Sequence, residues 1–204
     1  YFFLKVFSLY LRNAPTFAYK ITYKIIYSLL FHALKMRQKT VLINLRWAFP
    51  DKNEEWYQNI MQQCYKFFTK EFLDFISFPK NYSSTSVKFK NLEVLTEAHA
   101  MNKGIILVGS HYGSFDKLFY ALSKKEYNLT GVAYKQNNSG ADIFFKQIRE
   151  HFMEDQLYKG GDIKQLKNAL VKNNILILLS DQDAKKKGTM AVSYTHLRAH
   201  ETAT

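Results

Sequence analysis

Residues 104–116 read Gly104-Ile105-Ile106-Leu107-Val108-Gly109-Ser110-His111-Tyr112-Gly113-Ser114-Phe115-Asp116, and this stretch decides the fold. Its apolar run, 105–108, is short and bounded by glycine, which is typical of a buried strand. The glycine and serine before Phe115 supply a flexible turn and a candidate N-cap for a helix over 113–124. The stretch therefore predicts a strand followed by a helix, with His111 at the exit of the strand and Asp116 in the first helical turn.

His111 and Asp116 have the parts of a general base and its orienting group. Imidazole titrates near neutral pH and can accept a proton from a hydroxyl. A carboxylate on its other ring nitrogen holds the tautomer and stabilises the imidazolium. A separation of five positions does not fit one helix face, but it suits a histidine in the turn before a helix and an aspartate in the first turn. The alternative is a loop histidine beside an unrelated aspartate at a helix N-terminus.

Beyond residue 86 the pattern alternates between short apolar segments and amphipathic ones. Such alternation predicts an α/β domain with a mostly parallel sheet flanked by helices. In these sheets ligands bind beyond the carboxyl ends of the strands, so His111 and the segment Asp181-Gln182-Asp183 are expected at the same edge. We expect strands at 87–90, 105–108, 128–135 and 175–179, and helices at 92–102, 113–124, 141–152 and 164–172.

Other polar groups follow these strands. Tyr134 and Lys135 end the third strand, where Lys135 either holds a phosphate or another anion or is a solvated turn lysine. Asp181 and Asp183 either bind a metal, position a substrate hydroxyl or cap a loop. Ser110 is not favoured as a nucleophile, because the Gly-x-Ser-x-Gly elbow is absent around it.

The composition is that of a folded, basic protein. Hydrophobic residues make up 47% of the 204 residues, and the formal net charge is +12. That charge predicts an anionic partner, which is a nucleic acid, an anionic membrane surface or an acidic carrier protein. The single cysteine, Cys64, excludes an internal disulfide framework. The chain has no Walker phosphate loop, no Rossmann glycine triplet and no zinc-ligand spacing.

The first 80 residues are expected to be helical. Residues 1–34 form an apolar segment edged by Lys and Tyr, and its longest uncharged run, 25–34, is too short to cross a bilayer. We expect a membrane-associated helical segment, lying in the interface or forming part of an anchor, with a pair of buried helices as the alternative. Residues 35–80 are read as a second helical region and 81–190 as a truncated α/β core.

The last residues, 191–204, differ in character from the rest. Reverse translation of 192–202, which read VSYTHLRAHET, reproduces a transposase-type sequencing adapter. We therefore predict that this segment is an artefact of library preparation and leave it out of the fold. Its histidines, His196 and His200, have the spacing of a metal pair and are not taken as one.

Together these motifs resemble the lipid A biosynthesis (lauroyl- and myristoyl-) acyltransferases, within the wider lysophospholipid acyltransferase-like superfamily. The matching segments occur in the order of the family and cover about residues 35–190. They are Asn44-Leu45-Arg46-Trp47-Ala48-Phe49-Pro50, similar to an "NL-x-x-AFP" element; the strand and His-x4-Asp motif of 104–116; Tyr134-Lys135 with Asn138; and Leu178-Leu179-Ser180-Asp181-Gln182-Asp183, similar to a "DQ" segment. Lys135 stands where the family commonly has arginine, and Ser139 where it usually has proline.

The resemblance implies an acyltransferase of lipopolysaccharide biosynthesis at the cytoplasmic face of the inner membrane. It would move a fatty acyl group from acyl carrier protein to a hydroxyl of a lipid A precursor. By the resemblance, His111 and Asp116 would be catalytic, and no cofactor is implied. The residues that would contact substrate are Tyr134, Lys135, Asn138, Asp181 and Asp183.

Two rival functions remain open at this point. A glycerophospholipid or lysophospholipid acyltransferase needs the same base and carboxylate. A non-catalytic, basic membrane-binding protein needs neither. On that hypothesis, His111→Ala would leave binding and the biological effect unchanged. Nucleic acid is not expected as a partner, because the aromatic residues lie on apolar helix faces rather than among exposed basic strands.

Overall fold

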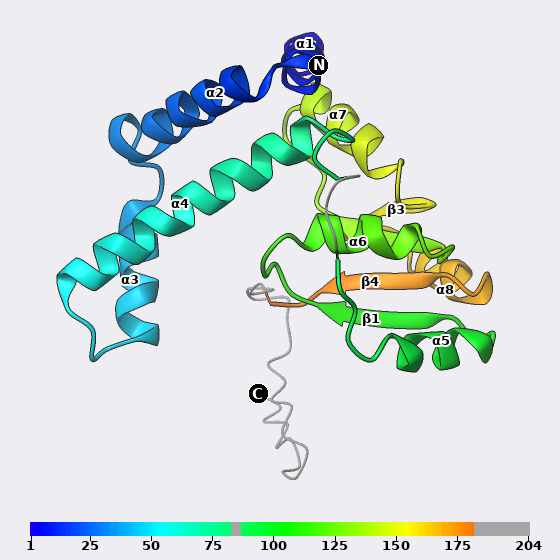
Figure 1. Cartoon of the computed structure of the whole chain (residues 1–204). Helices are drawn as coiled ribbons and strands as arrows, with labels where there is room; N and C mark the ends of the chain where they lie inside the picture. The colour runs from blue at the N-terminus through cyan, green and yellow to red at the C-terminus, as the bar shows by residue number, and fades with distance from the viewer. Residues whose placement is uncertain (83–86, 182–204) are drawn as a thin grey trace.

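The computed structural model describes residues 1–82 and 87–181 (Figure 1). A helical layer comes first in the chain. In Figure 1 the long helix of this layer runs diagonally, with the second helix above it and the third below its lower end. Its elements are α1 (Phe2–Asn13), α2 (Thr16–Ser28), the π-helical turn η1 (Leu29–Ala33), α3 (Gln38–Ala48) and the long α4 (Glu54–Ile76). Asn53 caps the N-terminus of α4, its side chain accepting a hydrogen bond from the backbone N–H of Trp56 at 2.9 Å.

An α/β layer follows, and its sheet is parallel as predicted. The strand order is β1-β4-β2-β3, and all three described pairings are parallel. Helices connect successive strands, which parallel pairing requires. The elements are α5 (Leu92–Ala100), β1 (Ile105–Gly109), α6 (Phe115–Ser123), β2 (Leu129–Ala133), α7 (Ser139–Arg149), β3 (Asp155–Tyr158), α8 (Ile163–Val171) and β4 (Ile175–Leu179).

One strand prediction was wrong, and one strand was missed. Residues 87–90 alternate in polarity but form no strand, although Phe89 packs against the core. The structure instead has β3, which was missed because its sequence, Asp-Gln-Leu-Tyr, carries no apolar run and pairs with β2 alone. The burial of β1 also differs from the prediction. It lies at the edge of the described sheet and exposes Ile106 and Val108, whereas β4 lies between β1 and β2 and begins with three buried residues.

One continuous hydrophobic core joins the two layers. Leu11 of α1 and Leu73 of α4 are fully buried, and they belong to the same cluster as Phe119 of α6 and Ile175 of β4. Burial of a side chain of this size contributes about 2 kcal/mol. Helices α1 and α4 are therefore packed onto the sheet domain.

A buried group of charges fastens α6 to α4. The ammonium of Lys117 lies 2.8 Å from Asp74 Oδ2 and 3.0 Å from Glu71 Oε1. Asp74 also accepts hydrogen bonds from Tyr19 of α2 at 2.5 Å and from Lys70 at 2.6 Å. Burial tends to raise the pKa of Asp74, but these donors outweigh it and hold that pKa below its ordinary value. Three helices thus converge on one ionised carboxylate.

Lys117→Met is expected to destabilise the protein by about 3 kcal/mol, because it leaves buried carboxylates without their partner. Urea unfolding at neutral pH measures this. Lys70→Met is the matched control, since Lys70 also bonds to Asp74 but its side chain is 56% exposed. Its loss should stay below about 1 kcal/mol. Equal losses for the two variants would contradict a special role for the buried lysine.

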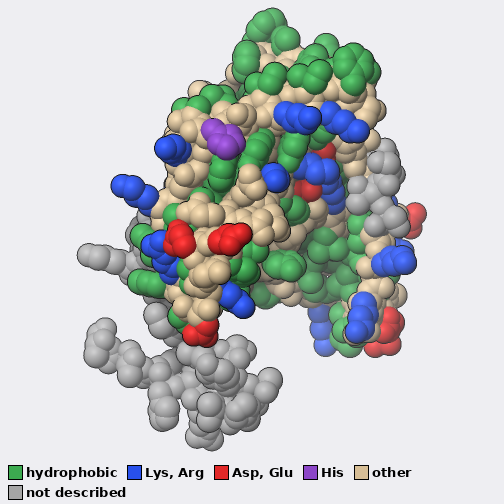
Figure 2. Space-filling view, turned by 60° about the vertical axis from the view of Figure 1, so that its left-hand side comes forward, with side chains coloured by type: hydrophobic (Ala, Val, Ile, Leu, Met, Phe, Trp, Pro, Cys, Tyr) green, Lys and Arg blue, Asp and Glu red, His purple; other side chains and the backbone are tan. Residues whose placement is uncertain are grey.

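The N-terminal helices carry much exposed apolar surface. Phe2, Phe3, Phe17, Ile21 and Ile25 are each more than half exposed. Figure 2 shows hydrophobic side chains gathered at the top of the molecule, where Figure 1 places α1 and α2. Among the described residues, none of the helices combines the length and apolarity needed to cross a membrane. Association of this region with a membrane stays a prediction.

Candidate active site

The carboxyl ends of the four strands bring together side chains that are far apart in the sequence. His111 follows β1, Asp181 follows β4, Tyr134 follows β2 and Lys159 follows β3. Because all the strands run in one direction, these residues meet at one edge of the sheet. The prediction that His111 and Asp181 share an edge is confirmed.

His111 is held by Asp181 through two contacts. The ring Nδ1 lies 2.8 Å from Asp181 Oδ1, and the backbone N–H of His111 donates to Asp181 Oδ2 at 3.0 Å. The pairing follows from register, since Gly109 of β1 faces Leu179 of β4 and each residue lies two positions further on. The hydrogen bond from His111 lowers the pKa of Asp181. An ionised Asp181 accepts from Nδ1–H, which leaves Nε2 as the proton acceptor.

Asp116 lies in the first turn of α6, as predicted, and is half-buried beside His111. Burial raises the pKa of Asp116 to about 6, with a further increase from Glu71, while Arg149 and His111 act in the opposite direction. The ring nitrogen that the sequence paired with Asp116 is bonded to Asp181 in the structure. Asp116 therefore acts on His111 through space, and its catalytic role stays a prediction.

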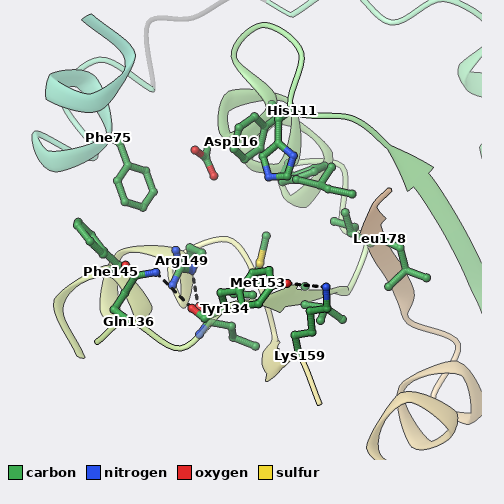
Figure 3. Close-up of a pocket in the computed structure, with 18 of the residues that line it drawn as sticks. Phe75, His111, Asp116, Tyr134, Gln136, Phe145, Arg149, Met153, Lys159 and Leu178 are labelled. Atoms are coloured by element: carbon green, nitrogen blue, oxygen red, sulfur yellow. Dashed lines mark hydrogen bonds between the residues drawn. The ribbon is translucent and has the colours of Figure 1, made fainter. Parts of the chain in front are cut away.

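A cavity of about 590 Å³ opens beside these residues. In Figure 3, His111 and Asp116 lie on one side of it and Arg149, Tyr134 and Lys159 on the other. Most of its remaining wall is apolar, supplied by α4, α6, α7, the α7–β3 connection and β4: Phe72, Phe75, Phe115, Phe119, Phe145, Met153, Ile177, Leu178 and Leu179. The arrangement is an apolar space with a base and cations at its walls, which suits a hydrocarbon chain bearing one reactive polar group.

Arg149 and Lys159 were missed by the sequence analysis. Arg149 ends α7 one turn after Phe145, so a charge on the inward face of an amphipathic helix was the available signal. Its Nε donates to Gln156, and its Nη2 is buried with no hydrogen-bond partner in the described structure. Lys159 donates to the hydroxyl of Tyr134 at 2.5 Å. The position of Lys159 in the site could not be predicted, because Lys159 follows β3 and that strand was not predicted.

The remaining predicted residues lie at the margin of the site. Asn138 caps α7, its side-chain oxygen accepting from the backbone N–H of Ala141 at 3.0 Å. Lys135 is exposed and does not line the cavity. Asp183 and the segment from residue 191 lie outside the described residues. Across residues 1–82 and 87–181 no group of three or more His, Cys, Asp or Glu side chains is arranged to hold a metal ion.

Asp116→Asn is expected to stabilise the fold at pH 8 and to have no effect below about pH 4. The folded protein prefers protonated Asp116, so the stability that this carboxyl contributes is complete below its ordinary pKa of 3.8 and is lost as the pH rises through about 6. The shift corresponds to about 2 to 3 kcal/mol, which the neutral amide avoids. Urea unfolding from pH 4 to pH 8 measures it. Asp51→Asn, at an exposed position, is the control; a gain for Asp116→Asn that does not change with pH would contradict the prediction.

Comparison with known families gives one match. A family model described as bacterial lipid A biosynthesis acyltransferase matches residues 1–203. A search of curated proteins found no match. The matched range includes the segment from residue 191, whose origin as an adapter stays a prediction.

Proposed function

The chain belongs to the bacterial lipid A biosynthesis acyltransferase family, and on that premise we propose that it transfers a fatty acyl group from acyl carrier protein to a hydroxyl of a lipid A precursor. Membership itself indicates an acyltransferase of lipid A biosynthesis. The acyl donor, the hydroxyl acceptor and the roles of individual residues are what we propose. The observation that carries it is the His111 ring, held by a carboxylate, at the wall of an apolar cavity of about 590 Å³.

In the proposed reaction His111 is the general base. Its Nε2 takes the proton of the acceptor hydroxyl while Asp181 holds Nδ1–H, and the hydroxyl oxygen attacks the thioester carbonyl carbon. The C–S bond then breaks, the thiolate leaves, and the proton on His111 passes to the sulfur. Charge on Asp116 would stabilise the imidazolium formed in between. The acyl group passes directly to the acceptor hydroxyl without an acyl-enzyme intermediate. Ser110, next to the base, is not proposed as a nucleophile because the Gly-x-Ser-x-Gly elbow is absent around it.

The cations of the cavity supply the complementary charge. The thioester oxygen gains negative charge during attack, and a buried donor at that point lowers the barrier. Arg149 is the best placed for this, since it lines the cavity and its Nη2 is unpaired among the described residues. Lys159, across from His111 in Figure 3, would support the same charge or a phosphate of the acceptor. Lys135 would bind phosphate outside the cavity.

The apolar wall and the surface charge fit the two substrates. The aromatic residues around the cavity would cover the acyl chain, which leaves acyl carrier protein and enters apolar surroundings. The net charge of +12 favours both an acidic carrier protein and a phosphorylated glycolipid in an anionic leaflet. We propose that the enzyme acts at the cytoplasmic face of the inner membrane, with α1 and α2 against the lipid.

The test is an acyl-transfer assay on the purified protein. Labelled acyl carrier protein is the donor, a lipid A precursor the acceptor, and lysophosphatidic acid a competing acceptor. We expect label on the glycolipid. Label on the lysophospholipid alone would identify a lysophospholipid as the acceptor and leave the general-base mechanism unchanged. No transfer by a protein shown to be folded would refute the proposed reaction.

A further inference from the structure

A second cavity, of about 420 Å³, lies between α1 and α7, away from the site described above. Figure 1 shows α1 resting on α7 near the N-terminus. Its polar lining comes from Lys5 and Arg12 of α1, Gln147 of α7 and His151, just beyond α7. Its apolar lining is Val6, Leu9, Phe144 and Ile148. We call this cavity the α1–α7 groove.

The α1–α7 groove carries positive charge without a matching acid. None of its lining residues is Asp or Glu. Lys5 lies over the ring of Tyr1, 4.6 Å from its centroid, which leaves its charge uncompensated. Glu150, the acid next to His151 in the chain, is 3.5 Å from Lys146 instead. A groove of this kind attracts an anionic group.

The spacing of the cations indicates an amphiphile rather than a bare anion. Lys5 and Arg12 are two turns apart on α1, or about 10 Å along the helix axis. Val6 and Leu9 line the groove between them, and Phe144 and Ile148 face these side chains from α7. An occupant that covers this apolar surface and meets the cations must combine an anionic group with a hydrocarbon part.

The outer surface of α1 favours a lipid over an acidic peptide. Phe2 is 80% exposed, Phe3 77% and Leu9 61%, and Leu9 also lines the groove. Apolar side chains next to basic ones on one helix are typical of helices that lie in a membrane interface. The groove therefore opens along the helix face that a bilayer would cover, where an individual lipid can enter it sideways.

We propose that the α1–α7 groove binds one anionic phospholipid of the membrane. Lys5, Arg12 and His151 contact its phosphate, and the start of an acyl chain lies on Val6 and Leu9. This inference rests on the membrane contact in the proposed function. Because α7 also carries Phe145 and Arg149 into the active-site cavity, the bound lipid and the reacting substrate share one helix.

The test measures binding to vesicles of phosphatidylcholine alone and of phosphatidylcholine mixed with phosphatidylglycerol. The variant Lys5→Gln/Arg12→Gln is compared with Lys20→Gln/Lys24→Gln on α2, where both lysines are exposed. Loss of non-specific attraction is about fivefold per basic residue and would be the same for both variants. We expect the groove variant to lose about tenfold more affinity than the control for the mixed vesicles, and no more than the control for phosphatidylcholine.

A charge-neutral variant tests the shape of the groove. Leu9→Trp adds bulk to its wall and should lower affinity for the mixed vesicles about tenfold, leaving only the non-specific charge attraction, while keeping binding to phosphatidylcholine. Acyl transfer to a detergent-dispersed glycolipid should be unchanged in all these variants, so failure of the lipid site and failure of the proposed reaction are distinguishable. Equal losses for the two double variants, no preference for phosphatidylglycerol in the wild type, or displacement by soluble glycerophosphoglycerol would each overturn the lipid site.

Discussion

His111→Ala is expected to lower kcat for acyl transfer by about 10²- to 10⁴-fold while leaving KM nearly unchanged. The ring Nε2 is the proton acceptor that the acceptor hydroxyl would meet, since Nδ1 is occupied by Asp181 at 2.8 Å. The remaining cavity, with its cations and apolar wall, still binds both substrates. Steady-state kinetics with labelled acyl carrier protein measure the two constants separately.

His32→Ala is the control for this experiment, because His32 lies in η1, outside the lining of the cavity. It should retain wild-type kcat. Urea unfolding of both variants shows whether the fold is intact. Unchanged kcat in a folded His111→Ala protein would refute the general-base mechanism and favour a non-catalytic membrane protein.

Asp181→Asn is expected to lower kcat by about 10²- to 10³-fold with little effect on stability. An asparagine amide can donate to Nδ1, which moves the ring proton to Nε2 and removes the base from the reaction. The carboxylate also stabilises the imidazolium, and the amide does not. Because Asp181 is at the surface edge of the site, with 36% of its side chain exposed, the substitution leaves the core intact.

The same assay on Asp116→Asn separates the two carboxylates. Transfer that survives Asp181→Asn at the wild-type rate but is abolished by Asp116→Asn would contradict the pairing seen here, and would mean that Asp116 takes over Nδ1 when substrate is bound. Asp181→Glu is the conservative variant, and it should retain more activity than Asp181→Asn because it keeps the charge.

Much of the architecture was predictable because it depends on local patterns. The apolar runs at 105–108 and 175–179 became β1 and β4, and the alternating pattern expected beyond residue 86 corresponds to the elements from α5 onward. The strand 155–158 was not predictable, because its polar residues become a strand only by pairing with β2. The place of Lys159 in the site was not predictable for the same reason, because it depends on that strand.

Apart from β3, the sequence by itself determined the alternation of helices and strands, the parallel sheet and the placement of His111 and Asp181 at its carboxyl edge. Strand polarity and connection length carry this information along the chain. Only the tertiary structure decided which carboxylate bonds to Nδ1, because that depends on β4 lying beside β1 in register, 70 residues apart in sequence. It also decided that Arg149 enters the cavity and that burial raises the pKa of Asp116, since both effects come from neighbours supplied by other elements.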